Sequence, residues 1–159
     1  MIRTARCSLT GLQSTDLEPL VRLHLDPDVM HYLGGPREEG AIREHLANLL
    51  ETGSKNPIWA VRLTQDDVFM GIITLTPHHD GEDTEISYLF LPEWWGKGYA
   101  TEAVQVILNH GLTKLGQPRI IAETQTANKA SLRLLERLGM EFERKVERFD
   151  AEQSIYTTI

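Results

Sequence analysis

The run Trp94-Trp95-Gly96-Lys97-Gly98-Tyr99-Ala100-Thr101-Glu102-Ala103 lies where an apolar stretch gives way to an amphipathic pattern. Its two glycines stand two positions apart and have no Cβ, so the backbone can turn tightly there and approach a ligand closely. The helix predicted after the turn directs its unpaired amides, with their partial positive charge, toward that turn. The sequence therefore predicts an anion site, with a diphosphate as the obvious ligand and Lys97 adding charge at its rim.

Two common nucleotide-binding patterns do not fit this turn. The P-loop needs Gly-x-x-x-x-Gly-Lys-Ser/Thr, a spacing that the sequence does not contain. A dinucleotide fingerprint would read Gly96-x-Gly98, but Thr101 stands at its third glycine position. The turn also comes about two-thirds of the way along the chain, whereas a Rossmann unit opens a βαβ series. A phosphate-bearing ligand of another kind is expected.

The stretch from Leu91 to Ala103 resembles the acyl-CoA pyrophosphate loop of the GNAT N-acetyltransferase superfamily. The family pattern Gln/Arg-x-x-Gly-x-Gly/Ala is matched by Gly98 and Ala100, with Trp95 at the Gln/Arg position. Because the loop acts mainly through backbone amides, this departure concerns one side-chain contact. The resemblance implies acetyl-CoA as cosubstrate and a backbone amide near Leu89 to Leu91 that polarises its carbonyl. The cofactor-binding positions that it implies are Phe90, Leu91, Trp95, Gly96, Lys97, Gly98, Tyr99, Ala100, Thr101, Asn128 and Ser131.

Two further blocks support the resemblance. The segment from Asn128 to Phe142 is similar to the family's later strand–Asn–helix–Gly segment, which holds the pantetheine arm. The segment from Asp26 to Pro36 resembles the substrate loop of the RimJ/RimL-like branch, which acetylates protein N-termini and small amines. In that loop His31 and Tyr32 are candidates for contact with the acceptor, and packing of the loop against the second helix is the alternative.

Transfer of an acyl group to an amine requires a base, because only the neutral amine attacks the thioester. Glu85, at the start of the strand that enters the glycine turn, is the candidate, and family members carry a carboxylate at the corresponding position. A solvated strand end is the alternative reading of Glu85. Glu123, in an apolar strand, is the rival carboxylate, although a salt bridge to a basic neighbour is expected there.

The leaving thiolate requires a hydrogen-bond donor. Many family members use a tyrosine seven residues after the motif asparagine, where this chain has Leu135. In the RimL-like branch a serine three residues after the asparagine is the proposed replacement, and Ser131 occupies that position. An ordinary residue of the first helical turn is the alternative interpretation of Ser131. Asn128 is also a favoured helix N-cap, which is compatible with holding a pantetheine amide.

Composition limits the other classes of function. A chain of 159 residues with 41% hydrophobic residues is long enough for one domain, 1–159, with a real core. A net charge of −7 argues against binding to nucleic acid or anionic membranes and suits cationic amine substrates. No apolar run is long enough to span a bilayer and the first residues lack a signal sequence, so a cytoplasmic location is expected.

No metal site is expected either. Cys7 is the only cysteine, which excludes an intrachain disulfide and a cysteine-based zinc cluster. His78 and His79 stand in a polar turn without a third ligand at a suitable spacing, so they are interpreted as loop histidines.

Hydrophobic periodicity predicts the order β-α-α-β-β-β-α-β-α-β-β. Strands are expected over 2–12, 58–63, 68–75, 85–91, 119–126, 142–148 and 154–159, and helices over 15–25, 38–50, 100–115 and 129–138. A capping box of Thr15 and Glu18 is predicted to start the first helix. This order and the resemblance together imply an α/β (α+β) fold of GNAT type, with a mixed, mostly antiparallel sheet of six to seven strands flanked by about four helices.

The sequence thus predicts an acetyl-CoA-dependent N-acetyltransferase in which a primary amine, of a protein N-terminus or a small molecule, attacks the thioester directly. A non-catalytic acyl-CoA sensor or interaction module is the alternative, and a nucleotide-binding module is a third possibility. The resemblance also makes a homodimer possible, through pairing of edge strands.

Overall fold

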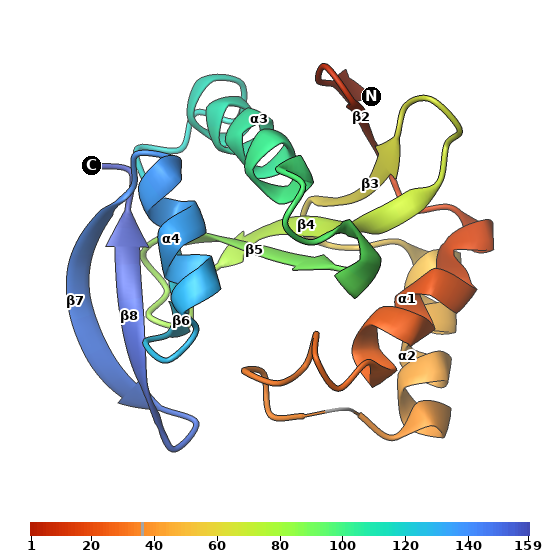
Figure 1. Ribbon diagram of the computed structural model, residues 1–159, viewed down its shortest axis with the longest axis horizontal. Helices are drawn as coiled ribbons and strands as arrows, with labels where there is room; N and C mark the ends of the chain where they lie inside the picture. The colour runs from red at the N-terminus through yellow and green to blue at the C-terminus, as the bar shows by residue number, and fades with distance from the viewer. Residues whose placement is uncertain (36) are drawn as a thin grey trace.

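The computed structural model describes residues 1–35 and 37–159, which form one eight-stranded sheet with helices on both faces (Figure 1). The strands are β1 (Ile2–Arg3), β2 (Cys7–Thr10), β3 (Ile58–Leu63), β4 (Phe69–Pro77), β5 (Thr84–Phe90), β6 (Ile120–Gln125), β7 (Glu141–Arg148) and β8 (Ala151–Thr157). Their order across the sheet is β1-β2-β3-β4-β5-β6-β8-β7, and only β5 and β6 pair in parallel. The mixed, mostly antiparallel sheet expected from the sequence is confirmed.

Four α-helices are present in the described part of the chain: α1 (Leu17–Leu25), α2 (Glu39–Thr52), α3 (Tyr99–Thr113) and α4 (Lys129–Arg137). Two short 3-10 turns, Ser14–Asp16 and Pro92–Trp94, precede α1 and α3. The expected number of helices is therefore confirmed. None of these helices is both long enough and apolar enough to cross a membrane.

The sheet has eight strands rather than the expected six to seven, because the first predicted strand folds back on itself. β1 and β2 pair in antiparallel register, with Ile2 opposite Leu9. The turn between them is held by the carboxylate of Glu102, in the first turn of α3. That carboxylate accepts hydrogen bonds from the hydroxyl of Thr4 and from the amide of Arg6, the latter at 2.8 Å.

The predicted capping box of Thr15 and Glu18 is wrong by two positions, because Gln13 and Asp16 form the capping box. The amide of Gln13 instead donates to the carboxylate of Asp16 at 2.8 Å. Asp16 is buried and also forms a two-pronged ion pair with Arg62 of β3, with distances of 2.9 and 2.7 Å. The position of the cap is thus set by a partner on a distant strand.

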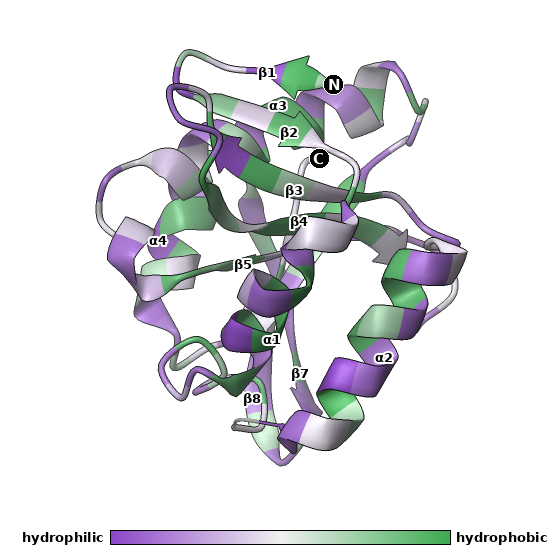
Figure 2. Ribbon diagram, turned by 90° about the vertical axis from the view of Figure 1, so that its right-hand side faces the viewer, coloured by the Kyte–Doolittle hydropathy of each residue, from purple (hydrophilic) through white to green (hydrophobic). Residues whose placement is uncertain are grey.

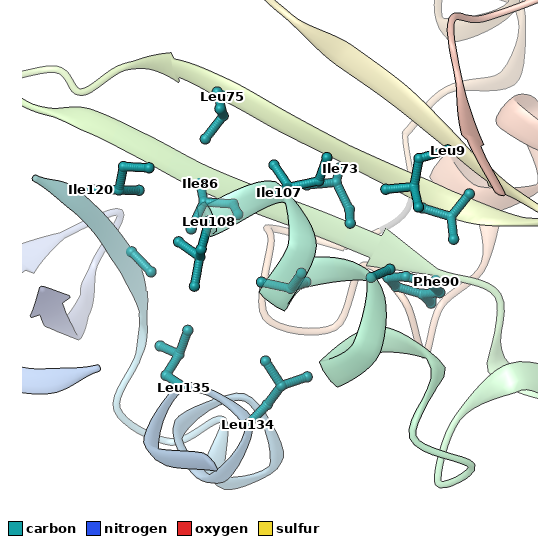
Figure 3. Packing of buried hydrophobic residues seen from close by; sticks show 14 of the residues in the cluster. Leu9, Ile73, Leu75, Ile86, Phe90, Ile107, Leu108, Ile120, Leu134 and Leu135 are labelled. Carbon is teal, nitrogen blue, oxygen red and sulfur yellow. The ribbon is translucent and has the colours of Figure 1, made fainter. Parts of the chain in front are cut away.

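The two faces of the sheet carry separate hydrophobic cores. One core lies under α3 and α4, and Figure 3 shows side chains from these helices converging with those of β4 and β5. The other lies under α1 and α2, the helices nearest the viewer in Figure 2. β5 contributes to both by alternation: Ile86 and Phe90 enter the first core, and Leu89, together with Leu91 directly after the strand, packs in the second.

The sheet opens between β5 and β6. These strands pair only where Thr84 faces Ile120 and Glu85 faces Ile121. Beyond Glu85, β5 continues beside β4 as far as Phe90, and β6 continues beside β8 (Figure 1). The carboxyl-terminal half of β5 therefore has a strand partner on one side only.

Candidate active site

The glycine turn leads from β5 into α3 with its backbone amides free of side-chain caps. Gly96 and Gly98 have φ values of +73° and +84°, in the left-handed region that glycine adopts readily. Gly98 is the N-cap of α3, and no side chain among the described residues caps this end. The first amides of a helix have no acceptor within it, so those of Tyr99, Ala100 and Thr101 are available to an anion.

Two tryptophans fix the turn to the body of the protein. The indole Nε1 of Trp95 donates to the carbonyl of Phe90 at 2.8 Å, although 47% of Trp95 is exposed. Trp94 packs against both hydrophobic cores. The Nζ of Lys97 donates to the carbonyl of Glu93 at 2.9 Å, so the lysine side chain extends back toward the residues that precede the turn.

Arg6 brings a second cation to the turn, which the sequence analysis missed. Its guanidinium donates to the carbonyl of Lys97 at 3.1 Å and lies over the ring of Tyr99, 4.2 Å from the centroid. Glu102 holds the guanidinium in place at 2.9 Å. No local signal marks Arg6, because it meets the turn only through the hairpin of β1 and β2.

The edge of β5 that faces the opening presents backbone amides that do not donate to β4. The amide of Leu91 donates to the carbonyl of Met70 on β4 at 2.9 Å. Hydrogen bonds alternate along an antiparallel pair, so the amides of Phe90 and Tyr88 point away from β4 toward the opening. Of the two strand positions predicted to bind the cofactor, Phe90 presents its amide there, whereas the amide of Leu91 is already used.

Asn128 and Ser131 begin α4 on the other side of the opening. The Oδ1 of Asn128 accepts a hydrogen bond from the amide of Ser131 at 3.2 Å, so its capping role is confirmed. The Oγ of Ser131 lies 2.6 Å from the Oη of Tyr88, a residue that the sequence analysis did not single out. Leu135, at the position where the family resemblance implied a tyrosine, is fully buried in the core.

Glu85 lies at the apex of the opening, as the last residue of β5 that pairs with β6. Burial raises the pKa of its carboxyl from 4.5 to about 7, an increase that the negative charge of Glu123 reinforces and a positive charge on His78 opposes. A carboxyl with this pKa can exchange protons near neutral pH. Its side chain points toward the face that α1 and α2 cover, as the predicted alternation requires.

His78 lies in the loop after β4, as expected, but it is buried rather than exposed to solvent. Its side chain is fully buried, with Nε2 at 2.7 Å from Glu123 and Nδ1 at 3.0 Å from Asp80. Burial alone would lower the pKa of His78, but the hydrogen bonds to these two carboxylates outweigh it and raise the pKa. Glu123 also pairs with Arg148 at 2.6 Å, which confirms the expected salt bridge.

The same cluster supplies the third metal ligand that the sequence analysis did not find. Donor atoms of His78, His79 and Glu123 lie within 4.8 Å of one another. Both ring nitrogens of His78 already engage carboxylates, however, and Arg148 holds the other oxygen of Glu123. We therefore interpret the cluster as an ion-pair network.

His31 and Tyr32 lie in the segment between α1 and α2. Their rings meet edge to face at 4.6 Å, and His31 is exposed. The side-chain amide of Gln125, at the end of β6, donates to the carbonyl of Tyr32 at 3.0 Å. The segment thus approaches the carboxyl end of β6, while Pro36 lies outside the described residues.

Comparisons with known proteins agree with this arrangement. A family model described as an acetyltransferase (GNAT) domain matches residues 6–141. The uncharacterized N-acetyltransferase YnaD of Bacillus subtilis is 30% identical over 142 residues, which cover 87% of this chain and 81% of the relative. The uncharacterized protein YkkB of the same organism is 28% identical over 158 residues, covering 96% of this chain and 92% of YkkB.

Solved structures show the same fold. A GNAT-family acetyltransferase from Bacillus anthracis superimposes with a TM-score of 0.85 at 27% identity, covering 99% of this chain and 97% of the other. A spermidine N-acetyltransferase from Vibrio cholerae, solved with CoA and spermine, superimposes with a TM-score of 0.82 at 22% identity, covering 97% and 95%. With a family model that extends over most of its length, from β2 into β7, this chain belongs to the GNAT acetyltransferase family.

Proposed function

We propose that this protein transfers the acetyl group of acetyl-CoA to a primary amine, of a protein N-terminus or a small molecule, as a RimJ/RimL-like enzyme. The observation that carries the proposal is the uncapped glycine turn at the start of α3, placed beside the opening between β5 and β6. An anion site next to unpaired strand amides suits a ligand that has a diphosphate at one end and a carbonyl at the other.

The residues of the turn suit acetyl-CoA as cosubstrate. Backbone amides from Gly96 to Thr101 would hold its diphosphate, whereas the amide of Trp95 already donates to the carbonyl of Pro92 at 3.1 Å. The guanidinium of Arg6 adds a charge beside them. Asn128 and Ser131 would hold the pantetheine arm across the opening, with the amide of Phe90 facing it from β5. Acetyl-CoA supplies an activated acetyl group in a thioester, so the reaction needs no covalent enzyme intermediate.

Glu85 is the base in this proposal. Reference pKa values are about 10.4 for a lysine-type amine and about 7.7–8.0 for an α-amine, so a proton must leave the acceptor before or during attack. The pKa of Glu85, about 7, suits proton acceptance near neutral pH. Glu123 is less suited because Arg148 and His78 already occupy both of its oxygens.

The test is thiol release from acetyl-CoA over a panel of peptides, amino acids, polyamines and amine antibiotics. Polyamines belong in the panel because one structural neighbour is a spermidine N-acetyltransferase. Release with one class of amine would support the transferase and define its acceptor. Failure of acetyl-CoA to bind would refute the proposal.

A sensor that binds acyl-CoA without turnover is the second candidate, favoured by Leu135 at the tyrosine position. Glu85→Gln separates the two. A transferase loses turnover but still binds acetyl-CoA, whereas a sensor binds acetyl-CoA and shows no turnover before or after the substitution.

A further inference from the structure

A tyrosine and a serine meet across the opening of the sheet. Tyr88 comes from the middle of β5, and Ser131 from the first turn of α4, which follows β6. Their hydroxyl oxygens are 2.6 Å apart although 43 positions separate them in the sequence. The contact is thus made by the two elements that border the proposed pantetheine site.

Either hydroxyl can donate in this contact, and the chemistry of the two groups favours donation by the phenol. A phenol ionises near pH 10, whereas the serine hydroxyl does not titrate in the same range, so the phenol is the better donor. Burial raises the pKa of Tyr88 further, and its bond to Ser131 opposes that increase only in part. Tyr88 therefore stays protonated, so its O–H is available to donate to Ser131 Oγ, an arrangement that leaves the serine O–H free to point elsewhere.

Ser131 is also fixed from its other side. Its amide donates to the Oδ1 of Asn128 at 3.2 Å, which holds the serine backbone at the first turn of the helix. With the backbone held by Asn128 and Oγ held by Tyr88, few orientations remain for the serine hydroxyl proton. A donor held in this way loses little entropy when it binds an anion.

We propose that Tyr88 is a positioning residue that donates to Ser131 Oγ and so directs the serine O–H at the sulfur of the departing thiolate. The inference rests on the acetyl transfer proposed above. It provides, from β5, a phenol in place of the one absent at position 135, where Leu135 faces the core. Ser131 and Tyr88 would act together as one donor.

The atoms balance without ionisation of either hydroxyl. The nitrogen lone pair of the amine forms the new C–N bond, and the C–S bond breaks with its electron pair going to sulfur. The proton of the amine passes to Glu85. The thiolate accepts a hydrogen bond from Ser131 and takes its proton from solvent as the product leaves.

The first test is a double-mutant cycle with Tyr88→Phe and Ser131→Ala. Each variant should lower kcat by about 10- to 100-fold, the value of a hydrogen bond to a charged group, with the KM for acetyl-CoA changed less than about threefold. Because Tyr88 acts through Ser131, the double variant should be no slower than Ser131→Ala. Losses that multiply in the double variant, or full activity of Tyr88→Phe, would overturn the inference.

Tyr156→Phe is the matched control. Tyr156 is 6% exposed, and its hydroxyl donates to Glu136 on α4 at 3.2 Å, so the same atom is removed from another tyrosine of the same core. This variant should keep kcat within about twofold of wild type. An equal loss in both variants would show a general effect of the lost hydroxyl on packing and would overturn the positioning role.

The second test needs no turnover. The ultraviolet absorbance of the thiolate gives the pKa of the thiol of bound CoA, which a preorganised donor lowers. This pKa should be about one unit lower in wild type and Tyr156→Phe than in Tyr88→Phe. Equal pKa values in all three proteins would overturn the inference, whereas the expected difference without acetyl transfer to any amine would overturn only the proposed function.

Discussion

Replacing Glu85 with glutamine should slow the proposed reaction and at the same time stabilise the protein at alkaline pH. The carboxyl lies where β5 and β6 separate, and burial raises its pKa from 4.5 to about 7. The folded protein therefore holds a proton at Glu85 that the unfolded chain has released between these pH values. Stability from this group is present in full below pH 4.5 and is lost as pH rises through 7.

The magnitude follows from the size of the shift. A change from 4.5 to about 7 corresponds, at about 1.4 kcal/mol per pKa unit, to a penalty of up to about 3 kcal/mol for ionised Glu85. Glutamine has a similar shape and no charge, so it avoids the penalty. The stability of Glu85→Gln relative to wild type should rise by about 2–3 kcal/mol between about pH 4.5 and about pH 8.5.

Urea unfolding of both proteins across this pH range measures the difference. Asp83→Asn, two positions earlier, is a control of opposite sign. The guanidinium of Arg119, at 2.8 Å, lowers the pKa of the Asp83 carboxyl, so this variant should lose stability relative to wild type as pH rises through the acid range. A stability difference between Glu85→Gln and wild type that does not change with pH would refute the reasoning, as would full activity of that variant.

Three further substitutions test the framework of the site. Gly98→Ala places a side chain at a φ of +84°, which costs about 1–2 kcal/mol and favours a turn that has left its binding conformation. Calorimetry should therefore show about tenfold weaker acetyl-CoA binding, and unchanged affinity would contradict the role of the turn. Arg62→Met leaves Asp16 buried without its partner and should cost about 3–5 kcal/mol in urea unfolding, whereas a loss below about 1 kcal/mol would contradict this. Gly71→Ala puts a Cβ 2.2 Å from the carbonyl oxygen of Leu89, so it should lower stability by about 1–3 kcal/mol, and a fully stable variant would show that β4 and β5 can part freely.

Elements with strong local signals could be predicted from the sequence closely. The helix expected over 100–115 is Tyr99–Thr113, and the helix expected over 129–138 is Lys129–Arg137. Each has a recognisable start, a glycine turn or an asparagine cap, followed by an apolar stripe. Where local signals agree in this way, they determine the bounds of a helix without information from distant contacts.

Features set by distant partners could not be predicted. The hairpin of β1 and β2 depends on Glu102, which lies almost a hundred positions after Thr4. The cap before α1 depends in the same way on Arg62. A short stretch of sequence does not identify these distant partners, because each side chain resembles any other polar residue of a strand or helix.

The candidate site also contains residues that local motifs predict and residues that they do not. The positions of the glycine turn, of Asn128 and of Ser131 follow from motifs, and the structure brings them to the two sides of one opening. The partners of these residues do not follow from motifs. Arg6 reaches the turn and Tyr88 reaches Ser131 only because the sheet orders its strands as it does.

The divergence of β5 and β6 also explains how one strand could serve both the removal of the amine proton and the hydrogen bonding of the leaving thiolate in the proposed reaction. Side chains alternate along β5, so Glu85 points to the face covered by α1 and α2, and Tyr88 to the face covered by α3 and α4. A base on one face and the hydroxyl pair on the other suit an amine and a thioester that approach from opposite sides of the sheet. The backbone amides of β5 lie between them, where charge would develop on the carbonyl oxygen. Direct attack is then the simplest chemistry for this geometry, because the opening brings both reactants to one edge without any intermediate bound to the protein.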